Sequence, residues 1–240
     1  MIKDKRKLKE YIFNHIDFSN VHKILDLGCG NGDDLNLLDE MFPNRKFELY
    51  GVDKIECTTP LTVRYIKHDL NLVLPFESQS FDLIYSHNLL ECIKDKNAHL
   101  REIYRLLKPA GQVVCSHTDW DSQLIDGENK DLMRKVVRAY SEWKQPWMDE
   151  IDSWLGRRLH GIFNNSGLFK GDVKSYNVIN TSFSEGNYCF NTIKSFEELV
   201  KNNLITKEEF DEFYAGILTY EEQNKFFYSV TTFIYYGIKI

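Results

Sequence analysis

The fold is decided by one stretch of the chain, Lys23-Ile24-Leu25-Asp26-Leu27-Gly28-Cys29-Gly30-Asn31-Gly32-Asp33-Asp34. Its first five residues are mostly apolar, which predicts a short buried strand. Three glycines then stand at every second position, and a helix is predicted to begin after them. Glycine adopts a positive φ without a steric penalty and lets a ligand approach the backbone closely. A strand that runs through such a turn into a helix is the usual way in which an α/β protein holds the polar part of a nucleotide.

The spacing of the glycines argues against a dinucleotide. A dinucleotide site has glycine at the first, third and sixth positions, so that the helix faces a pyrophosphate. Counted from Gly28, the sixth position is Asp33, and Asp34 follows it. Two carboxylates would repel a diphosphate, but not a ligand that is neutral or cationic at this point. A Walker-type phosphate loop would need Gly-Lys-Ser/Thr, and the sequence has none.

Length and composition indicate one soluble globular domain. The 240 residues are 42% hydrophobic and 28% charged, and no apolar run approaches the roughly 20 residues of a membrane span. The charged start of the chain, Met1 to Arg6, is unlike an export signal. The net charge of −6 argues against a nucleic-acid partner. We therefore expect a cytoplasmic protein without a membrane or nucleic-acid partner.

The cysteines support the same compartment. There are five, with no Cys-x-x-Cys pair. Such a set fits reduced thiols better than a disulfide framework or a zinc site. No metal site is expected.

Strands and helices alternate through the first half of the chain. Apolar periodicity predicts a helix over residues 5–16 and strands at Lys23–Leu27, Phe47–Asp53, Thr62–Asp69, Phe81–Ser86 and Gln112–His117, with helices between most of them. This alternation predicts an α/β fold with a doubly wound parallel sheet, whose ligands bind at the carboxyl ends of the strands.

The second half is organised differently. Residues 128–145 and 150–167 are predicted to be helical, Val173–Ile179 a strand, 193–222 two helices, and Phe226–Ile238 a long strand. The chain has no linker-like composition and no internal repeat. We therefore expect a single domain over 1–240, with helical insertions at about 122–150 and 183–222 that form a cap.

Acids stand where several of the predicted strands end. Asp53 follows the glycine turn by about twenty residues, where a carboxylate accepts the ribose hydroxyls of a nucleotide. The alternative for Asp53 is a surface acid in a turn. Asp69 is expected to accept from an adenine amino group beside the Leu70 backbone, unless it simply begins a loop. Asp26, beneath the turn, is expected to hold a ligand ammonium through the turn backbone or a water molecule.

The chain resembles the class I S-adenosylmethionine (SAM) methyltransferases, and within them the small-molecule group often labelled type 11. The motif Asp26-x-Gly28-x-Gly30-x-Gly32 is similar to their motif I. Three later segments also match their pattern: Leu90-Glu91-Cys92, with cysteine in place of the usual histidine, Leu107-Lys108-Pro109-Ala110-Gly111, and the final strand Phe226 to Gly237. The ordered set is more specific than any one motif.

The resemblance implies a Rossmann-like seven-stranded sheet of order 3-2-1-4-5-7-6, with strand 7 antiparallel. It also implies SAM as the methyl donor. The residues expected to contact SAM are Asp26, Gly28, Cys29, Gly30, Gly32, Asp53, Lys54, Asp69, Leu70, Ser86 and His87.

The acceptor site is expected after the fourth and fifth strands. Methyl transfer from a sulfonium is a direct displacement, so the enzyme mainly has to align the reacting atoms. A base matters only when the acceptor must lose a proton early. The segment Ser116 to Ser122 predicts His117 as a general base or orienting group, with Asp119, Trp120 or Asp121 in contact with the acceptor. In the alternative, Asp119 or Asp121 caps the next helix and Trp120 packs in the core.

A second candidate for the acceptor site lies in residues 143–154, where Trp143, Trp147 and Trp154 are interleaved with acids. Indoles with carboxylates suit an amine or ammonium acceptor, although helical aromatics often simply pack. Related methyltransferases often carry Gly-Arg-Arg-Leu, matched by Gly156 to Leu159. Arg157 is thus expected to bind an acceptor carboxylate or, alternatively, to form a salt bridge.

These observations predict a SAM-dependent methyltransferase for a small molecule, with nitrogen slightly favoured over oxygen. The alternative is a non-catalytic SAM-binding partner subunit. Nucleic-acid methylation is disfavoured because Ser86-His87-Asn88-Leu89 stands where amino-methylating nucleic-acid enzymes carry Asn-Pro-Pro-Tyr.

Overall fold

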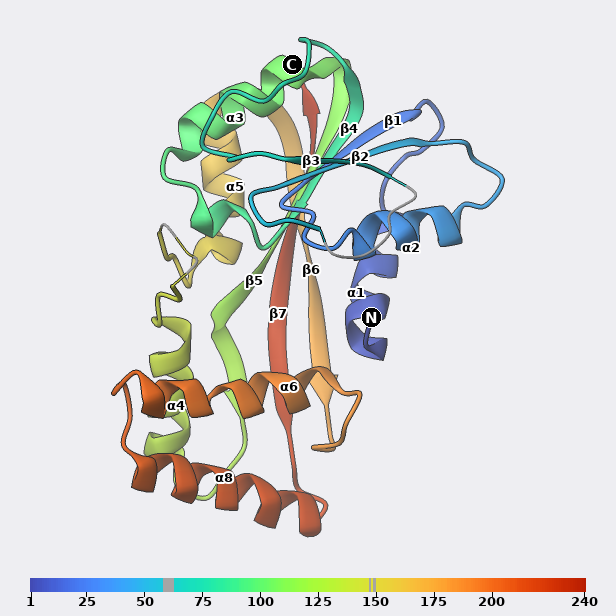
Figure 1. Cartoon of the computed structure of the whole chain (residues 1–240). Coiled ribbons are helices and arrows are strands. Elements are labelled where there is room, and N and C mark those ends of the chain that lie inside the picture. Colours follow the sequence, from blue (N-terminus) through green and yellow to red (C-terminus); the bar gives the residue numbers. More distant parts are fainter. Residues whose placement is uncertain (58–62, 147, 149) are drawn as a thin grey trace.

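A computed structural model describes residues 1–57, 63–146, 148 and 150–240. The strands form one sheet in the order β3-β2-β1-β4-β5-β7-β6 (Figure 1). The first five run parallel, while β7 is antiparallel to both β5 and β6. The predicted strand order is confirmed. The strands are β1 (Lys23–Leu27), β2 (Glu48–Asp53), β3 (Arg64–Lys67), β4 (Phe81–His87), β5 (Leu107–Ile125), β6 (Phe169–Asn180) and β7 (Tyr228–Lys239).

The glycine turn, Asp53 and His87 lie at one edge of the sheet because three parallel strands end there. In the register of the sheet, Leu27 at the end of β1 lies beside Val52 of β2 and Ser86 of β4. The residues that follow these three positions therefore leave the sheet together, as expected for the carboxyl edge of a doubly wound sheet.

Helices cover both faces of the parallel part. On one face lie α1 (Lys3–Asn14) and α2 (Asp33–Met41), and on the other α3 (Lys96–Leu106), the 3₁₀ helix η1 (Leu90–Cys92) and α5 (Leu155–Ser166). Successive strand side chains point to opposite faces, so Ile24 packs with α1 and α2 whereas Leu25 packs with α3 and α5. Two covered faces explain why four successive residues of β1, Ile24 to Leu27, are all buried.

The three long strands β5, β6 and β7 extend past the parallel sheet and carry a helical lobe (Figure 1). The lobe contains α4 (Lys130–Ser141), α6 (Tyr188–Ser195), α7 (Glu197–Lys201) and α8 (Lys207–Glu222). It has its own hydrophobic core, in which Val136, Phe196, Phe213 and Tyr228 are fully buried. The helices of the two expected insertions lie in this lobe.

The strand predicted at Gln112–His117 is much longer than expected. β5 runs to Ile125 and pairs with β7 on both sides of a bulge, so that Asp119 pairs with Thr231 and Ile125 with Tyr228 while residues 120–123 have no partner in the register. The segment Asp119-Trp120-Asp121 is therefore part of a strand. The alternative in which Asp119 or Asp121 caps the next helix is wrong, since the side chain of Asn129 caps α4.

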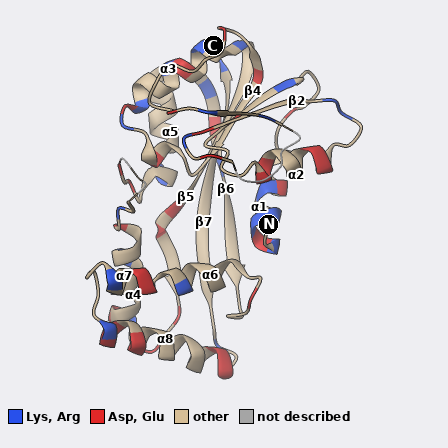
Figure 2. Ribbon diagram, viewed as in Figure 1, with Lys and Arg blue, Asp and Glu red and all other residues tan. Residues whose placement is uncertain are grey.

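Charged side chains are mixed over the surface. Figure 2 shows Lys and Arg scattered among Asp and Glu, without a basic stripe in this view. Of the helices that the structure describes, none is long and apolar enough to cross a bilayer.

Candidate functional site

The glycine turn adopts the backbone that its composition predicts. Gly28, Gly30 and Gly32 have φ values of +75°, +52° and +74°. The Gly28 amide donates to the Val52 carbonyl at 2.8 Å, which holds the turn against β2. A Cβ added to Gly30 would meet no atom within 4 Å, whereas one on Gly28 would lie 3.0 Å from Leu89. The space in front of Gly30 is thus open, and a ligand can come close to the backbone there.

Asp53 ties this turn to the end of β2. One carboxylate oxygen accepts the Gly30 amide at 2.8 Å and the other accepts the Ile55 amide at 3.0 Å. A carboxylate offers about four acceptor positions, so two remain for hydroxyl donors. The geometry fits the recognition of a ribose.

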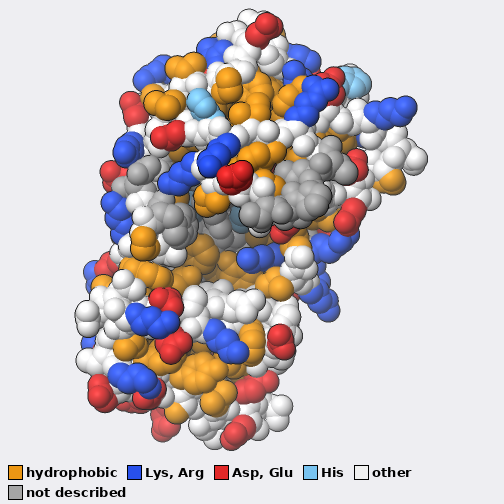
Figure 3. Space-filling view, viewed as in Figure 1, with side chains coloured by type: hydrophobic (Ala, Val, Ile, Leu, Met, Phe, Trp, Pro, Cys, Tyr) orange, Lys and Arg blue, Asp and Glu red, His pale blue; other side chains and the backbone are white. Residues whose placement is uncertain are grey.

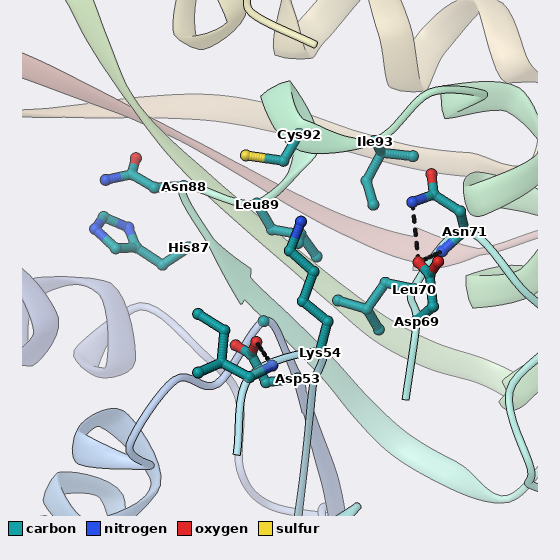
Figure 4. Close-up of a pocket in the computed structure, with 12 residues that line it drawn as sticks. Asp53, Lys54, Asp69, Leu70, Asn71, His87, Asn88, Leu89, Cys92 and Ile93 are labelled. Carbon is teal, nitrogen blue, oxygen red and sulfur yellow. Dashed lines mark hydrogen bonds between the residues drawn. The ribbon is translucent and has the colours of Figure 1, made fainter. Parts of the chain in front are cut away.

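Asp69 lies across a cavity from Asp53. Its carboxylate accepts the Asn71 amide at 2.9 Å and the Asn71 side chain at 3.0 Å, and these bonds lower the pKa of Asp69. Figure 4 shows Asp69 beside Leu70 on one side of the cavity and Asp53 with Lys54 on the other. This first cavity measures about 160 Å³ and is lined by Gly28, Asp53, Lys54, Ile55, Asp69, Leu70, Asn71, His87, Asn88, Leu89, Cys92 and Ile93.

A second cavity of about 330 Å³ adjoins the first and shares Gly28, His87 and Asn88 with it. Figure 3 shows a hollow with hydrophobic side chains at the waist between the sheet and the helical lobe. The walls come from α1, the glycine turn, the end of β4, β5 and α6. The lining residues are Met1, Lys5, Leu8, Lys9, Asp26, Gly28, Cys29, Gly30, Asn31, Asp33, Asp34, His87, Asn88, Trp120 and Tyr188.

Buried charges lie at the base of the second cavity. The Lys9 ammonium contacts Asp34 and, at 2.8 Å, the Tyr85 hydroxyl, and burial lowers the pKa of Lys9. Asp26 is 2% exposed, and burial together with the neighbouring Asp34 raises its pKa well above the ordinary value. A cationic ligand group would favour the ionised form of Asp26.

His87 lies between the two cavities with one ring nitrogen engaged. The Ser116 hydroxyl donates to the Ser86 carbonyl at 3.3 Å, which leaves it to accept the Nδ1–H of His87 at 2.8 Å. In this tautomer, assigned from the hydrogen bonds, Nε2 carries a lone pair. Burial, and then the charge of Lys9, lower the pKa of His87 well below its usual value, so the ring is neutral. It can accept a hydrogen bond.

β5 holds Asn88 in place through two hydrogen bonds. Its φ is +51°, its amide donates to the Ser116 carbonyl at 2.9 Å, and its side-chain oxygen accepts the Thr118 amide at 2.8 Å. Asn88 belongs to the wall of both cavities. A strained backbone that β5 holds in this way is typical of a functional position.

The predicted role of His117 is not supported. The side chain is 0% exposed, lies outside both cavities, and has Nδ1 2.8 Å from the Thr118 carbonyl. Val113 and Cys115 pack with α3 and α5, and His117 follows them with the same alternation along β5. The pleat therefore turns His117 away from the second cavity, and its ring cannot touch an acceptor that is bound there.

Asp119 and Arg157 bind each other. The fully buried Asp119 carboxylate accepts Nε and Nη2 of Arg157, each at 2.6 Å. The expectation that Asp119 contacts the acceptor is wrong, because the same pleat faces it toward α5. The alternative for Arg157, a salt bridge, is the observed one. Asp121 accepts the Trp154 indole N–H at 2.8 Å and is also outside the second cavity.

The described indoles of residues 143–154 do not form a cage. Trp143 packs on Tyr140 in the lobe with ring centroids 6.4 Å apart. Trp154 stacks under Arg157 and Arg158 instead. Trp147 lies outside the described residues. Trp120 is the one described indole that lines the second cavity.

Sequence reasoning missed the contribution of α1. In the sequence, Lys9 ends the basic run Lys3 to Lys9, which is typical of a solvated helix face, yet its side chain is only 6% exposed. A signal existed, because Lys9 is three and four residues before Ile12 and Phe13 and so belongs to the apolar stripe of the helix. Asn88 offered no comparable signal.

Comparison with known proteins agrees with this geometry. A family model described as a methyltransferase domain, type 11, matches residues 25–115. This range begins in β1 and ends within β5, so it contains the glycine turn, Asp53, Asp69 and His87.

Of three curated proteins to which the chain is similar, two are named for different methyl acceptors. An uncharacterized 37.1 kDa protein of a Streptomyces fradiae transposon is 29% identical over 57% of the chain, a match that spans 42% of that protein. A demethylmenaquinone methyltransferase of Staphylococcus saprophyticus is 28% identical over 72% of the chain and 78% of its own length. A ubiquinone biosynthesis O-methyltransferase of Cereibacter sphaeroides is 25% identical over 68% of the chain and 67% of its own length.

Solved structures share the fold. The YcgJ protein of Bacillus subtilis matches with a TM-score of 0.59 at 18% identity, over 98% of both chains. A Haemonchus contortus phosphoethanolamine N-methyltransferase 2, in complex with SAM, matches with a TM-score of 0.52 at 17% identity, over 97% of this chain and 52% of that one.

Proposed function

Since this chain is a class I SAM-dependent methyltransferase of the small-molecule group, we propose that it methylates a nitrogen or oxygen atom of a small acceptor bound in the second cavity. One observation carries the proposal. Gly28, His87 and Asn88 line both cavities, so a donor whose adenosine lies in the first would extend past Gly28 into the second and present its methyl group there.

The donor site follows the glycine turn. In this proposal the donor lies against the open face of Gly30, and Asp53 accepts hydrogen bonds from the ribose hydroxyls of the donor. Asp69 and Leu70 lie where the adenine would be, and the buried Asp26 is placed to balance the ammonium. Cys29, Lys54 and His87 line the two cavities and remain proposed contacts. Gly32 and Ser86 are in the lining of neither cavity and remain proposed contacts only from the resemblance to the family. When bound, the donor supplies an electrophilic methyl group on a sulfonium.

The acceptor would lie against Trp120 and Tyr188, which supply the aromatic wall of the second cavity. Nε2 of the neutral His87 can accept a hydrogen bond from the acceptor N–H or O–H, and the Asn88 amide group can donate one. These contacts would orient the nucleophile. Alignment of this kind is worth an effective concentration of roughly 10⁵–10⁸ M in well-oriented model reactions.

The expectation of a nitrogen acceptor depended on a cage of indoles in residues 143–154. Trp143 and Trp154 pack in different places and do not form such a cage, so this argument for nitrogen no longer holds. The relatives named for menaquinone and ubiquinone and the neighbour named for phosphoethanolamine support a small molecule. The acceptor-side cavity with polar groups favours an enzyme over a non-catalytic SAM-binding subunit.

Calorimetric titration with SAM and S-adenosylhomocysteine tests the donor site. We expect binding that is lost in Asp53→Ala and kept in Asp39→Ala, an exposed acid of α2. No binding of either compound to the wild-type chain would overturn the proposal. A mass-spectrometric screen of amines, phenols and carboxylates for a methyl-sized gain with SAM then tests the acceptor class, and no gain in any class would favour the non-catalytic alternative.

A further inference from the structure

The second cavity contains two buried ionisable side chains whose hydrogen-bonding capacity is not filled. Lys9 and Asp26 are 5% and 2% exposed, and both line this cavity. The proposed function uses Asp26 for the donor ammonium but gives Lys9 no task. Buried polar groups are nearly always satisfied, so unused capacity in the wall of a cavity indicates a ligand.

The hydrogen bonds of Lys9 use two of its three ammonium hydrogens. The nitrogen donates to Asp34 at 2.5 Å and to the Tyr85 hydroxyl at 2.8 Å, and this hydroxyl donates to Asp34 at 2.9 Å. The three groups form a closed triangle, which fixes the position of the nitrogen. Among the described residues no acceptor takes the third hydrogen, so it is available to a ligand in the second cavity.

Asp26 offers the complementary group. Its carboxyl receives no hydrogen bond from any residue that the structure describes, and it lies in the same cavity wall as Lys9. The charges of Lys9 and Asp34 both act on Asp26, which places these three groups near one another. A free ammonium hydrogen and a free carboxyl are thus held side by side.

The other charges of the cavity favour a ligand group that carries both signs. Asp34 balances Lys9, and the exposed Lys5 and Asp33 add one charge of each sign. Burial raises the pKa of Asp26, so the free protein has no large excess of charge in this cavity. Such a wall matches a group with adjacent positive and negative charges better than it matches a lone anion or a lone cation.

We propose that the second cavity contains a subsite for an amino-acid group, in which Lys9 binds the carboxylate and Asp26 the ammonium. The Lys9 ammonium donates a charge-assisted hydrogen bond, which is stronger than a neutral one. Two molecules of the proposed reaction can bring such a group. One is the donor, whose methionine end passes Gly28, and the other is an acceptor that is itself an amino acid, bound against Trp120 and Tyr188. The inference rests on the proposed function only for these two sources, because the unused hydrogen of Lys9 belongs to the free protein.

Calorimetry with two matched pairs of ligands tests the subsite. S-adenosylhomocysteine and its decarboxylated analogue, S-adenosyl-3-thiopropylamine, differ only in the carboxylate and test the donor as its source. L-phenylalanine and 2-phenylethylamine differ in the same way and test an amino-acid acceptor. In at least one pair, wild type should bind the member with the carboxylate about tenfold more tightly, or better, because a hydrogen bond to a charged group is lost in the other member.

Lys9→Met keeps an unbranched apolar stem but removes the ammonium, so it should weaken binding of the carboxylate member alone and abolish the preference. The exposed Lys7→Met on the same helix is the matched control and should keep it. The double variant Lys9→Met with Asp34→Asn leaves no carboxylate without its cation. It should also lack the preference, and it replaces Lys9→Met if that variant does not fold.

The outcomes separate this proposal from the donor site. A preference that depends on Lys9 in the adenosine pair identifies the donor as the source of the carboxylate, and one in the phenylalanine pair identifies the acceptor. Equal affinities within both pairs, or a preference that survives in Lys9→Met, overturn the subsite. A failure of the donor site is different, because neither adenosine ligand would then bind to wild type, and the phenylalanine pair would decide the subsite alone.

Discussion

Replacing Arg157 by alanine is the sharpest test of how β5 and α5 are joined. In wild type, the guanidinium donates two hydrogen bonds of 2.6 Å to Asp119, and the Arg157 backbone amide adds a weaker one at 3.3 Å. Arg157→Ala keeps only the backbone contact. The fully buried Asp119 carboxylate is then left without a counter-charge.

The magnitude follows from burial. Breaking a buried ion pair by removing one partner costs about 3–5 kcal/mol, because the remaining charge is not compensated. The Arg157 side chain is 38% exposed, so solvent screening places the expected loss at the lower end, about 3 kcal/mol. For a chain of this size that corresponds to a fall in Tm of about 6–12 °C.

Urea unfolding followed by circular dichroism measures this loss. Arg158→Ala is the matched control on the next residue of α5, since its bond to Asp152 is half-exposed and worth about 0–1 kcal/mol. The double variant Asp119→Asn with Arg157→Ala should recover part of the stability, because no buried charge then lacks a partner.

A different pattern would refute this reasoning. If Arg157→Ala unfolds at the same urea concentration as Arg158→Ala while KM for the identified acceptor rises, then Arg157 contacts the acceptor and the pair with Asp119 contributes little to stability. That result would restore the role predicted from the sequence.

Three further predictions concern the glycine turn and its surroundings. Burial and Asp34 raise the pKa of Asp26, and the ammonium group of a bound donor favours the ionised carboxylate. Below the pKa of Asp26, the affinity of the wild-type protein for S-adenosylhomocysteine should therefore rise with pH, by up to about tenfold per pH unit. Calorimetry at several pH values should show this rise in wild type and no pH dependence in Asp26→Asn. Gly30→Ala should cost about 1–2 kcal/mol in unfolding, as Gly186→Ala should, but the Gly30 variant alone should lose donor affinity, because its Cβ enters the open face of the turn. Burial raises the pKa of the Cys29 thiol, so its alkylation by iodoacetamide at pH 8, followed by peptide mass mapping, should be far slower than that of a free thiol, and equal rates would contradict the burial.

The features that could be predicted from the sequence are those whose structural requirements are met by residues within one short segment. The glycine turn was predictable because positive φ values at Gly28, Gly30 and Gly32 need residues without a Cβ. Asp53 was predictable because a parallel strand that follows the turn must end at the same sheet edge. The strand order came from the resemblance, and the sheet has that order.

The incorrect predictions, for His117 and Asp119, both lie in β5, where the direction of each side chain depends on pairing with a strand that is distant in the sequence. The local pattern Ser116 to Ser122 placed an imidazole, an indole and two acids together. Pairing with β7 keeps the segment extended as far as Asp119, so His117 and Asp119 share one face of β5 and Asp119 meets α5. Trp120 begins the bulge that follows and lines the cavity. Side chains that are neighbours in the chain thus lie on opposite faces of a sheet.

The sequence by itself determined the donor half of this protein: a strand, a glycine turn and an acid whose backbone requirements are local. Only the tertiary structure decided the acceptor half. Its wall is made by Lys9 of α1, Asn88 after β4, Trp120 of β5 and Tyr188 of α6, which are brought together by strand pairing and helix packing. Those long-range contacts leave no periodic signal in any single segment, so local pattern predicted Trp120 as a candidate contact of the acceptor but could not bring the four residues together.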